Sequence, residues 1–377
     1  MSRVYVMYGS DGAELALSIL EKMQVAEELA ALGRELGRRP LIGLKPNLVV
    51  AQPAEWGATT SPALVRGVLR YLSKEHGFDN VTILESSWAG ESTERAFAAC
   101  GYNELAQEFG VPLIDLKKDA GVPLVVEGLE LAVCRRALEL DYLISLPVLK
   151  AHCQTRLTCA LKNLKGCVPD SEKKRFHALG LHRPIACLNK ALKSRLTVVD
   201  GIIGDLCHEE GGTPVRMNRV IAGRDPVAVD AYVAALLGYS TEEIPYLGMA
   251  EKMGVGSTEY ELVELQSEKA PAPPEAALAG RTAESLSKWI AERQACSPCY
   301  GSVVHALMRL KEKGQLKGKW QVAVGQGCRG LTGELGVGEC AKGFRVRVAG
   351  CPPPAKEIVE MLLAWLAGES APQAPTR

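Results

Sequence analysis

Residues 142–152 have the sequence YLISLPVLKAH, an apolar run that is followed at once by a lysine and a histidine. The run has the length and composition of a buried strand. Similar short apolar runs alternate with longer helical patterns over residues 1–265. Alternating strands and helices are typical of a mostly parallel sheet with helices on both faces. The sequence therefore predicts an α/β ligand-binding domain over residues 1–265.

The predicted elements of this domain follow from the spacing of apolar residues. The predicted strands are Val4–Met7, Leu41–Leu44, Val81–Leu84, Leu113–Asp115, Tyr142–Leu146, Leu196–Val199 and Val220–Ala222. The predicted helices include Ala13–Leu36, Pro62–Glu75, Thr93–Cys100, Pro226–Leu237 and Thr241–Met253. A Glu-Gly turn between two apolar runs predicts an added hairpin over residues 122–133.

The chain after residue 265 has a different composition. Residues 266–281 include the Pro- and Ala-rich segment KAPAPPEAALAG, which is typical of a linker. Residues 282–370 combine helical and strand patterns with five cysteines, so we expect a small cysteine-rich α/β module there. A helix is predicted over Thr282–Gln294, and a Gly-rich loop is predicted to run as far as Gly343. Residues 371–377 are expected to form a disordered tail.

Bulk composition excludes several classes of partner. The 377 residues contain 44 basic and 44 acidic side chains, so the formal net charge is zero and nothing points to nucleic acid or an anionic membrane. No segment approaches the roughly 18 apolar residues of a membrane span. The N-terminus has no apolar signal core. We therefore expect a cytoplasmic protein, in which grouped cysteines indicate metal or redox chemistry rather than disulfides.

Five cysteines near the C-terminus have the spacing of metal ligands. They are Cys296 and Cys299 in a Cys-x-x-Cys pair, followed by Cys328, Cys340 and Cys351. Glycine lies shortly before each of the last three, which lets the backbone approach a bulky inorganic group. Four cysteine thiolates hold a cubane cluster. The sequence favours one [4Fe-4S] cluster, and a structural zinc site or a metal-free dithiol are the alternatives.

Five candidates compete for four ligand positions. Cys296, Cys299 and Cys351 are the firmer assignments. The fourth is Cys340 or Cys328, with preference for Cys340. Cys328 directly follows a predicted strand, however, and thus lies at the sheet edge from which the Cys351 loop also emerges. Both therefore stay candidates.

Polar side chains follow several predicted strands of the first domain. In open parallel sheets, ligands bind at the carboxyl ends of the strands. A shared strand-end site is therefore predicted. It includes Lys45, Asn47, Glu85, Ser86, Lys150, His152 and Asp200.

A second basic segment follows His152. In TCALKNLKG, Lys162, Asn163 and Lys165 lie within four residues, and the lysines supply point charges for a phosphate or carboxylate. We expect these lysines to bind an anionic small molecule together with the strand-end groups. His152 and Lys162 are the candidate catalytic residues. Imidazole titrates near neutral pH, which suits His152 to act as a general acid or base.

Other signals in the first domain have more than one interpretation. Cys153 lies beside the basic segment, where nearby cations would favour a nucleophilic thiolate, but a passive thiol is the simpler hypothesis. The HEEGG segment that contains Glu209 is either a cation site or a charged turn. The dinucleotide fingerprint, the P-loop and the nucleophile elbow are all absent from the sequence.

Eight segments of the chain resemble one family in the same order. They are LKPNLV, TTSPALVRGVLRYL, ILESS, DYLISLPVLKAH, TCALKNLKG, LTVVDGI, EEGGTPV and AGRDPVAVDAYVAALLG, which together span roughly residues 40–240. The match is to the uncharacterised "domain of unknown function 362" family. The resemblance implies an iron–sulfur association, usually through a ferredoxin-like pair of cysteine repeats. This chain lacks that pair, so its cysteine module is built differently.

The C-terminal module resembles a second group of proteins. VRVAGCPPPAKEIVEML is similar to the strand–GCPP–helix element of hydrogenase small subunits and of respiratory complex I. CSPCYGSVVHALMRL is similar to the opening of the hydrogenase small subunit. The resemblance implies that Cys351 is a [4Fe-4S] ligand and supports the same role for Cys296 and Cys299.

Two hypotheses for function follow. The first is an iron–sulfur oxidoreductase or electron-transfer protein that acts on an anionic small molecule, with a redox partner protein. The second is a non-catalytic anion- or cofactor-binding protein whose cysteine module is a structural, sensing or cluster-carrier site. The first predicts a brown protein, and the second is compatible with a colourless zinc protein.

Overall fold

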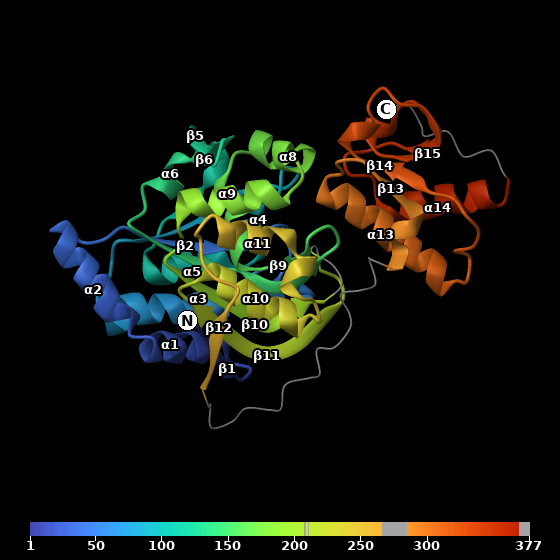
Figure 1. The fold of residues 1–377 in the computed structure, drawn as a ribbon. Coiled ribbons are helices and arrows are strands. Elements are labelled where there is room, and N and C mark those ends of the chain that lie inside the picture. The colour runs from blue at the N-terminus through green and yellow to red at the C-terminus, as the bar shows by residue number, and fades with distance from the viewer. Residues whose placement is uncertain (207–208, 210, 266–284, 369–377) are drawn as a thin grey trace. The chain divides into compact units, whose positions relative to one another are not determined.

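The computed structural model describes residues 1–206, 209, 211–265 and 285–368. The chain forms two compact units, one of residues 1–173 and 181–279 and the other of residues 174–180 and 280–377 (Figure 1). The predicted linker at 266–281 and the predicted tail at 371–377 lie outside the described residues. Each unit is treated below on its own.

A ten-stranded sheet forms the centre of the first unit. Its main path has the order β12-β1-β11-β10-β7-β2-β3-β4, and β8 and β9 branch from β10. Their bounds are β1 (Ser2–Tyr8), β2 (Ile42–Pro46), β3 (Val81–Glu85), β4 (Leu113–Asp115), β7 (Tyr142–Leu146), β8 (Val148–His152), β9 (Arg156–Thr158), β10 (Leu196–Asp205), β11 (Pro214–Gly223) and β12 (Tyr260–Leu265).

Strand direction divides this sheet. Strands β10, β7, β2, β3 and β4 are parallel to one another, as the alternating pattern predicts. Strand β11 is antiparallel to both β10 and β1. The eight residues between the bounds of β10 and β11 are too few for the crossover that a parallel pair requires. The mostly parallel α/β fold is confirmed, and the carboxyl ends of its parallel strands lie at one edge.

Helices cover both faces of the sheet (Figure 1). On one face of the sheet, a first group of helices packs against the strands in a single hydrophobic core. The helices of a second group contact one another and the sheet. The first group is α1 (Gly12–Lys22), α2 (Val25–Leu36), α3 (Pro62–Leu69), α4 (Thr93–Ala99) and α5 (Tyr102–Phe109). The second is α7 (Ala160–Asn163), α9 (His182–Leu192), α10 (Pro226–Leu236) and α11 (Pro245–Lys252).

Two local predictions have different outcomes. The predicted helix Ala13–Leu36 is wrong as a single element, because Gln24 has a φ of 55° and separates α1 from α2. The Tyr71 hydroxyl accepts a hydrogen bond from Ala26 N–H and so satisfies one free donor at the start of α2. The predicted hairpin is confirmed as β5 (Gly121–Val126) and β6 (Leu129–Cys134), with the turn at Glu127 and Gly128, both at positive φ.

The second unit contains a small sheet in which all strands are parallel. Its order is β13-β14-β15-β16, with bounds Ile290–Glu292, Val322–Val324, Gly333–Val337 and Phe344–Val348. Helix α13 (Ser297–Glu312) packs against α14 (Ala355–Leu366). Two predictions are wrong here: β13 lies inside the predicted helix Thr282–Gln294, and β15 lies inside the predicted Gly-rich loop.

Candidate functional site

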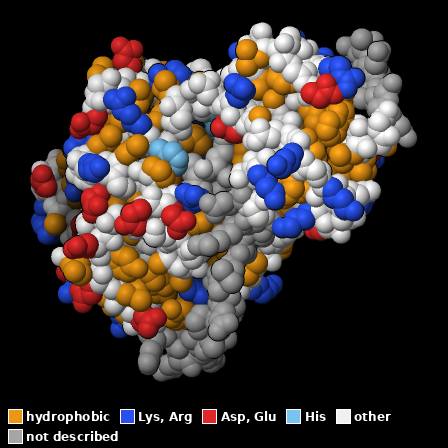
Figure 2. All heavy atoms as spheres, turned by 45° about the vertical axis from the view of Figure 1, so that its right-hand side comes forward, with side chains coloured by type: hydrophobic (Ala, Val, Ile, Leu, Met, Phe, Trp, Pro, Cys, Tyr) orange, Lys and Arg blue, Asp and Glu red, His pale blue; other side chains and the backbone are white. Residues whose placement is uncertain are grey.

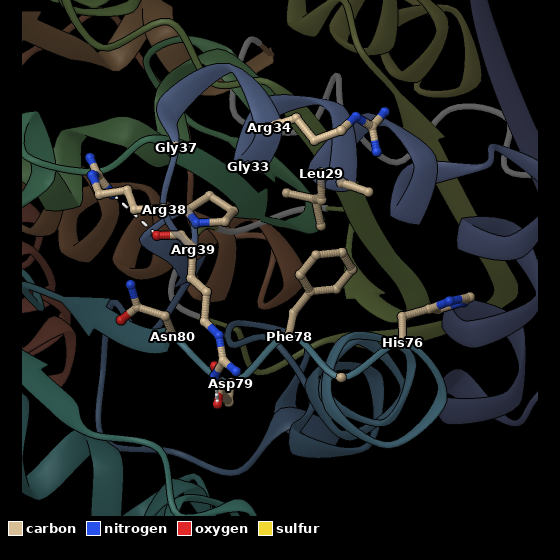
Figure 3. Close-up of a pocket in the computed structure, with 13 residues that line it drawn as sticks. Leu29, Gly33, Arg34, Gly37, Arg38, Arg39, His76, Phe78, Asp79 and Asn80 are labelled. Atoms are coloured by element: carbon tan, nitrogen blue, oxygen red, sulfur yellow. Dashed lines mark hydrogen bonds and ion pairs between the residues drawn. The ribbon is translucent and has the colours of Figure 1, made fainter.

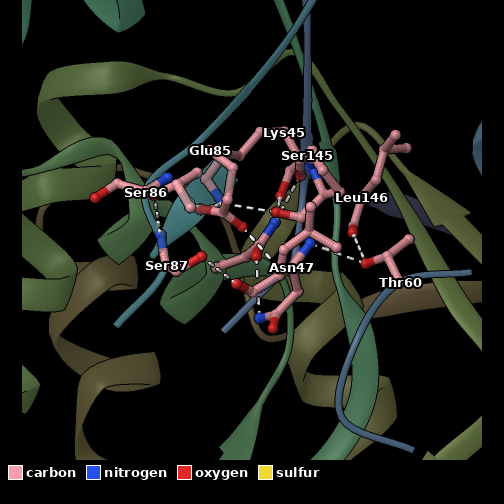
Figure 4. Close-up of polar contacts among 12 residues, drawn as sticks. Lys45, Asn47, Thr60, Glu85, Ser86, Ser87, Ser145 and Leu146 are labelled. Atoms are coloured by element: carbon pink, nitrogen blue, oxygen red, sulfur yellow. Dashed lines mark hydrogen bonds and ion pairs between the residues drawn. The ribbon is translucent and has the colours of Figure 1, made fainter. Parts of the chain in front are cut away.

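The carboxyl ends of β2 and β3 meet at a buried ion pair. Lys45 Nζ lies 2.7 Å from Glu85 Oε1, and both side chains are almost completely buried (Figure 4). Lys45 Nζ also donates to the Pro46 carbonyl oxygen, and Glu85 accepts from the backbone N–H groups of Leu48 and Ser86. A buried charge pair is stable only when its remaining hydrogen bonds are satisfied, as they are here.

Gly166 makes room for this pair. A Cβ atom at residue 166 would collide with Glu85 Oε1 and with the end of the Lys45 side chain. The sequence places this glycine directly after Lys165, whose side chain is half-buried. The predicted lysine segment thus reaches the β2–β3 edge through its backbone at Gly166.

Two asparagines connect the strand end to α7. Asn47 Nδ2 donates to Asn163 Oδ1 at 3.2 Å, and Asn163 Nδ2 donates to the Lys45 carbonyl and to Ser145 Oγ. Asn163 is buried, so these bonds fix the start of the LKG segment against β2 and β7. Figure 4 shows Asn47, Ser145 and Lys45 close together. The structure therefore brings Asn47 and Asn163 to one place, as the sequence predicts.

Lys150 lies at the same edge with three oxygen partners. Its Nζ donates to Asn47 Oδ1 at 3.2 Å, to the Ala58 carbonyl at 2.5 Å and to the Glu209 carbonyl at 2.8 Å. Its side chain is buried. An ammonium group has three protons, so these three acceptors use its full donor capacity.

Lys173 has a similar environment and was not predicted. Its Nζ donates to the carbonyls of Ser86 and Ser87, to Ser86 Oγ and to Asp170 Oδ1. Burial lowers the Lys173 pKa. The sequence carries little signal for it, because DSEKKRF has the composition of an exposed helix.

Asp200 lies at the β10 part of the edge and is buried. Its carboxylate accepts from the N–H groups of Ser61 and Ile202. Burial raises the pKa of Asp200 to about 6, although these two hydrogen bonds act in the opposite direction. Asp200 therefore anchors the start of α3 next to the strand end.

The His152 ring is fixed by the turn that follows β8. Its Nδ1 accepts from the N–H groups of Gln154 at 3.0 Å and Thr155 at 3.2 Å. The neutral ring consequently carries its proton on Nε2, because a nitrogen that accepts from two N–H groups has none of its own. Nε2 lies 3.6 Å from Glu209 Oε1. His152 thus presents an N–H donor toward Glu209.

Glu209 and Cys153 complete this group. Cys153 Sγ lies 3.0 Å from Glu209 Oε1, and Cys153 N–H donates to Glu209 Oε2 at 3.2 Å. One ligand atom from each of His152, Cys153 and Glu209 lies within 4.8 Å of the others. These residue types bind metals, but a metal-bound histidine usually donates through its other ring nitrogen. Here Nδ1 accepts two hydrogen bonds, so it has no proton to donate, and Nε2 carries the ring proton where a metal would bind.

Lys162 lies beside the same group on α7. Its Nζ donates to Thr158 Oγ1 at 3.2 Å, and its side chain is half-buried. Desolvation lowers the pKa of Lys162 to about 8, although Glu209 and Cys153 act to raise it. The two predicted catalytic residues, His152 and Lys162, therefore share the neighbours Cys153 and Glu209. The sequence offered both neighbours only as open alternatives.

A separate cavity lies at the opposite ends of the strands. It has a volume of about 420 Å³ and is lined by residues that precede β2 and β3, including Arg34, Arg38, Arg39 and Asn80 (Figure 3). Arg38 forms two bonds with Asp141, at 2.6 and 2.8 Å, and Arg39 pairs with Asp79. These two arginines are thus neutralised, and the cavity is not continuous with the strand-end residues above.

The surface carries charges of both signs. On the face drawn in Figure 2, basic and acidic side chains are scattered among apolar ones, in keeping with the zero net charge. Among the described residues, no helix is both long and apolar enough to span a bilayer.

In the second unit, a cysteine follows the carboxyl end of each parallel strand. Cys296 is the N-cap of α13 after β13, and Cys299 lies in the first turn of that helix. Cys328 follows β14, Cys340 follows β15 and Cys351 follows β16. Since the strands are parallel, all five cysteines lie at one edge of the sheet.

Arg329 connects several of these cysteines. A hydrogen bond to Cys340 raises the Arg329 pKa, and Cys340, Cys296 and Cys351 raise it further through their charge. Gln326 Nε2 donates to Cys296 Sγ at 3.6 Å. A Cβ atom at Gly338 would lie 3.9 Å from Cys299 Sγ. Arg329 was missed from the sequence, although it directly follows Cys328.

Cys328 differs from the other four cysteines. It is completely buried and packs in a small core with Ala323 and Ala341. Burial raises the pKa of its thiol. Cys296, Cys299 and Cys340 are half-buried and Cys351 is exposed. The accessible set is therefore Cys296, Cys299, Cys340 and Cys351.

Comparison with known proteins identifies one family. The model of the family described as "Domain of unknown function (DUF362)" matches residues 42–235, which is slightly more than half of the chain. The thylakoid-associated protein of Synechocystis sp. is 26% identical over 246 residues, which cover 63% of this chain and 75% of that protein.

Solved structures match more weakly. The lactate racemase apoprotein from Thermoanaerobacterium thermosaccharolyticum has 12% identity and a TM-score of 0.39, over 61% of this chain and 56% of that one. A protein from Thermotoga maritima has 14% identity and a TM-score of 0.32, over 61% and 59%. The chain thus spans less than two thirds of each of these structures.

Proposed function

This chain belongs to the DUF362 family, and we propose that it is a [4Fe-4S] protein that transfers electrons to or from an anionic small molecule. The cluster ligands are Cys296, Cys299, Cys340 and Cys351. The substrate site is the strand-end group around His152 and Lys162. The cytoplasm is the proposed location, because it keeps thiols reduced.

One observation carries the cluster assignment. Four parallel strands end at one edge, and the loop after each of them contains a cysteine. Four of these cysteines are accessible, and the Arg329 guanidinium lies near three of them, Cys340, Cys296 and Cys351. Four thiolates bring considerable negative charge together, and a neighbouring cation stabilises it. This donor set has the composition that a cubane cluster requires.

The surroundings of the cysteines also suit a redox role. Hydrogen bonds to sulfur and nearby charge set the potential of an iron–sulfur cluster, and Gln326 and Arg329 supply both. When bound, the cluster supplies one-electron transfer, and a redox partner protein is its proposed counterpart. Cys351 is exposed, so a redox partner could approach the proposed cluster from the side of this ligand.

The substrate assignment rests on the first unit. Lys162 and Lys165 are half-buried lysines of this edge, and His152 directs an N–H donor toward Glu209. A cation and an N–H donor together recognise a carboxylate or phosphate. We assign Lys45, Lys150 and Asn163 to holding the strand ends in place, because their polar atoms are bonded to protein oxygens.

A non-catalytic alternative has one observation in its favour. Lys45, Lys150 and Lys173 all have their ammonium groups satisfied by the protein, so much of the predicted positive charge is structural. A protein of this kind would bind an anion or a cofactor precursor, and its cysteine module would hold zinc or carry a cluster.

Anaerobic purification separates the two functions. We expect a brown protein with iron and sulfide near four per chain for a single cubane cluster, and a paramagnetic signal after reduction with dithionite. Cys351→Ser is expected to lose iron while the first unit keeps its unfolding transition. A colourless protein with one zinc per chain would overturn the electron-transfer proposal in favour of the alternative.

A further inference from the structure

The lysines at the strand-end edge fall into two groups. Lys45, Lys150 and Lys173 are buried, and each donates to at least two protein oxygens. Lys162 is half-buried, and Thr158 Oγ1 is the hydrogen-bond partner that the described residues provide for its Nζ. A hydroxyl is neutral, so it does little to hold the proton on an ammonium group. Lys162 therefore has fewer protein oxygens to hold its proton than Lys45, Lys150 or Lys173 have.

The neighbours of Lys162 are the groups that amine chemistry needs. Glu209 and Cys153 lie near enough to influence its charge. His152 Nε2 lies 3.6 Å from Glu209 Oε1 and carries the proton of the neutral ring. The group thus combines a half-buried amine with a buried N–H donor and a buried carboxylate.

We propose that Lys162 Nζ is a nucleophile that forms an imine with a small carboxylate that carries an aldehyde or 2-oxo group. Its nitrogen lone pair adds to the carbonyl carbon, the carbonyl π electrons go to oxygen, and one of the two nitrogen protons moves to that oxygen to give a neutral carbinolamine. Loss of the nitrogen proton and of the hydroxyl as water then forms the C=N bond. No oxidant or reductant is required.

Two neighbours have defined parts in this step. The His152 Nε2–H donates a hydrogen bond to the oxygen that gains negative charge, as an oxyanion donor does. The Glu209 carboxylate accepts the proton that leaves nitrogen and returns it to the departing hydroxyl. This inference rests on the proposed substrate site, and it narrows the anionic substrate to a carbonyl compound that carries a carboxylate.

Reductive trapping tests the proposal. The full-length protein is incubated with glyoxylate and sodium cyanoborohydride, and modified lysines are located by peptide mass spectrometry. Lys162 has a pKa of about 8, so at pH 7 it is a free amine roughly 200 times more often than an exposed lysine with an ordinary pKa near 10.4. We expect a carboxymethyl adduct on Lys162 well before the exposed Lys22 or Lys313 reacts.

Two variants sharpen this test. Glu209→Gln removes a charge that raises the Lys162 pKa, so the pH midpoint of labelling is expected to fall. Lys193→Arg is the control, since it changes an exposed lysine outside the proposed substrate site and leaves Lys162 in place. The mapping is made on the unsubstituted protein, so it does not depend on whether Lys162→Arg folds.

The outcomes distinguish this proposal from the cluster. Preferential labelling of Lys162 with a midpoint near pH 8 supports the imine. Labelling of Lys162 no faster than that of Lys22 overturns it, and so does a midpoint that Glu209→Gln leaves unchanged. Iron content and colour are measured on the same samples, so loss of the imine proposal leaves the electron-transfer proposal to be judged separately.

Discussion

The two sheets of this protein use the same edge in different ways. In the larger sheet, charged groups at the strand ends bond to protein atoms, as in the pair between Lys45 and Glu85. In the smaller sheet, the strand ends carry thiols, and four of the five are accessible. A fold places polar groups at this edge in both cases. The residue types at the strand ends decide whether the polar groups there bond to one another or stay available to bind a ligand.

The largest expected effect tests whether the polar groups at the edge of the larger sheet are held by bonds to one another. Lys45→Met leaves the Glu85 carboxylate buried without its cation, which we expect to lower the free energy of unfolding by about 3–5 kcal/mol. Urea denaturation of the first unit, followed by circular dichroism, measures the loss. Lys45→Met combined with Glu85→Leu should recover part of it. A loss below about 1 kcal/mol would show that this edge is not held by the pair.

The second prediction concerns pH. Asp200 has a folded-state pKa of about 6, above its unfolded value, so the folded protein keeps a proton that the unfolded chain has already released. Its contribution to stability is complete below about pH 4 and is lost as the pH rises through 6, by about 3 kcal/mol at most. In Asp200→Asn this decrease should be absent from a series of urea titrations. An identical pH slope in both proteins would contradict the prediction.

A smaller effect separates the two contested cysteines. Cys328→Ala removes a buried sulfur from a small core, so it should destabilise the second unit by about 1–2 kcal/mol and leave the iron content unchanged. Cys340→Ser changes an accessible thiol and should lose iron with little change in the stability of the metal-free unit. Iron analysis and thermal unfolding of both variants give the comparison. The reverse pattern would make Cys328 the fourth ligand.

The smallest expected effect sharpens the description of the accessible edge. Arg329→Gln removes a cation near Cys340, Cys296 and Cys351. Since an electron added to a cluster is stabilised by nearby positive charge, the reduction potential should fall by about 30 mV. A redox titration followed by visible absorption measures it, with Lys356→Gln on the exposed surface of α14 as the control. An unchanged potential would place Arg329 away from the redox group.

Much of the first unit could be predicted because its signals are local. Short apolar runs and the helices between them give a mostly parallel sheet, and the turn at Glu127 and Gly128 gives the hairpin. The position of Asn47 and Lys150 at one edge follows from strand direction. The break at Gln24 could not be predicted, because apolar residues continue on both sides of it. Tyr71, whose hydroxyl accepts from Ala26 N–H at the start of α2, lies far along the chain.

The chemistry of each lysine was not predictable in the same way. The sequence predicts that Lys150 and Lys162 bind the same anion. Among the described residues, however, Lys150 has three oxygen partners and Lys162 has a single hydroxyl. These partners are backbone carbonyls and distant side chains such as Glu209, which tertiary packing brings together. The spacing of the cysteines indicated a shared site, but the contrast between Cys328 and Cys340 depends on which residues of the short helices after β14 and β15 pack into the small core.

The parallel order of β13 to β16 also decides which parts of the chain must be present before the proposed ligands can meet. The proposed ligands come from loops that follow β13, β15 and β16, so they meet only after the last strand has paired. A nascent chain that ends before Cys351 contains Cys296, Cys299 and Cys340 but lacks the fourth proposed ligand. Under the proposed assignment, the complete set of ligands is present only in the folded second unit.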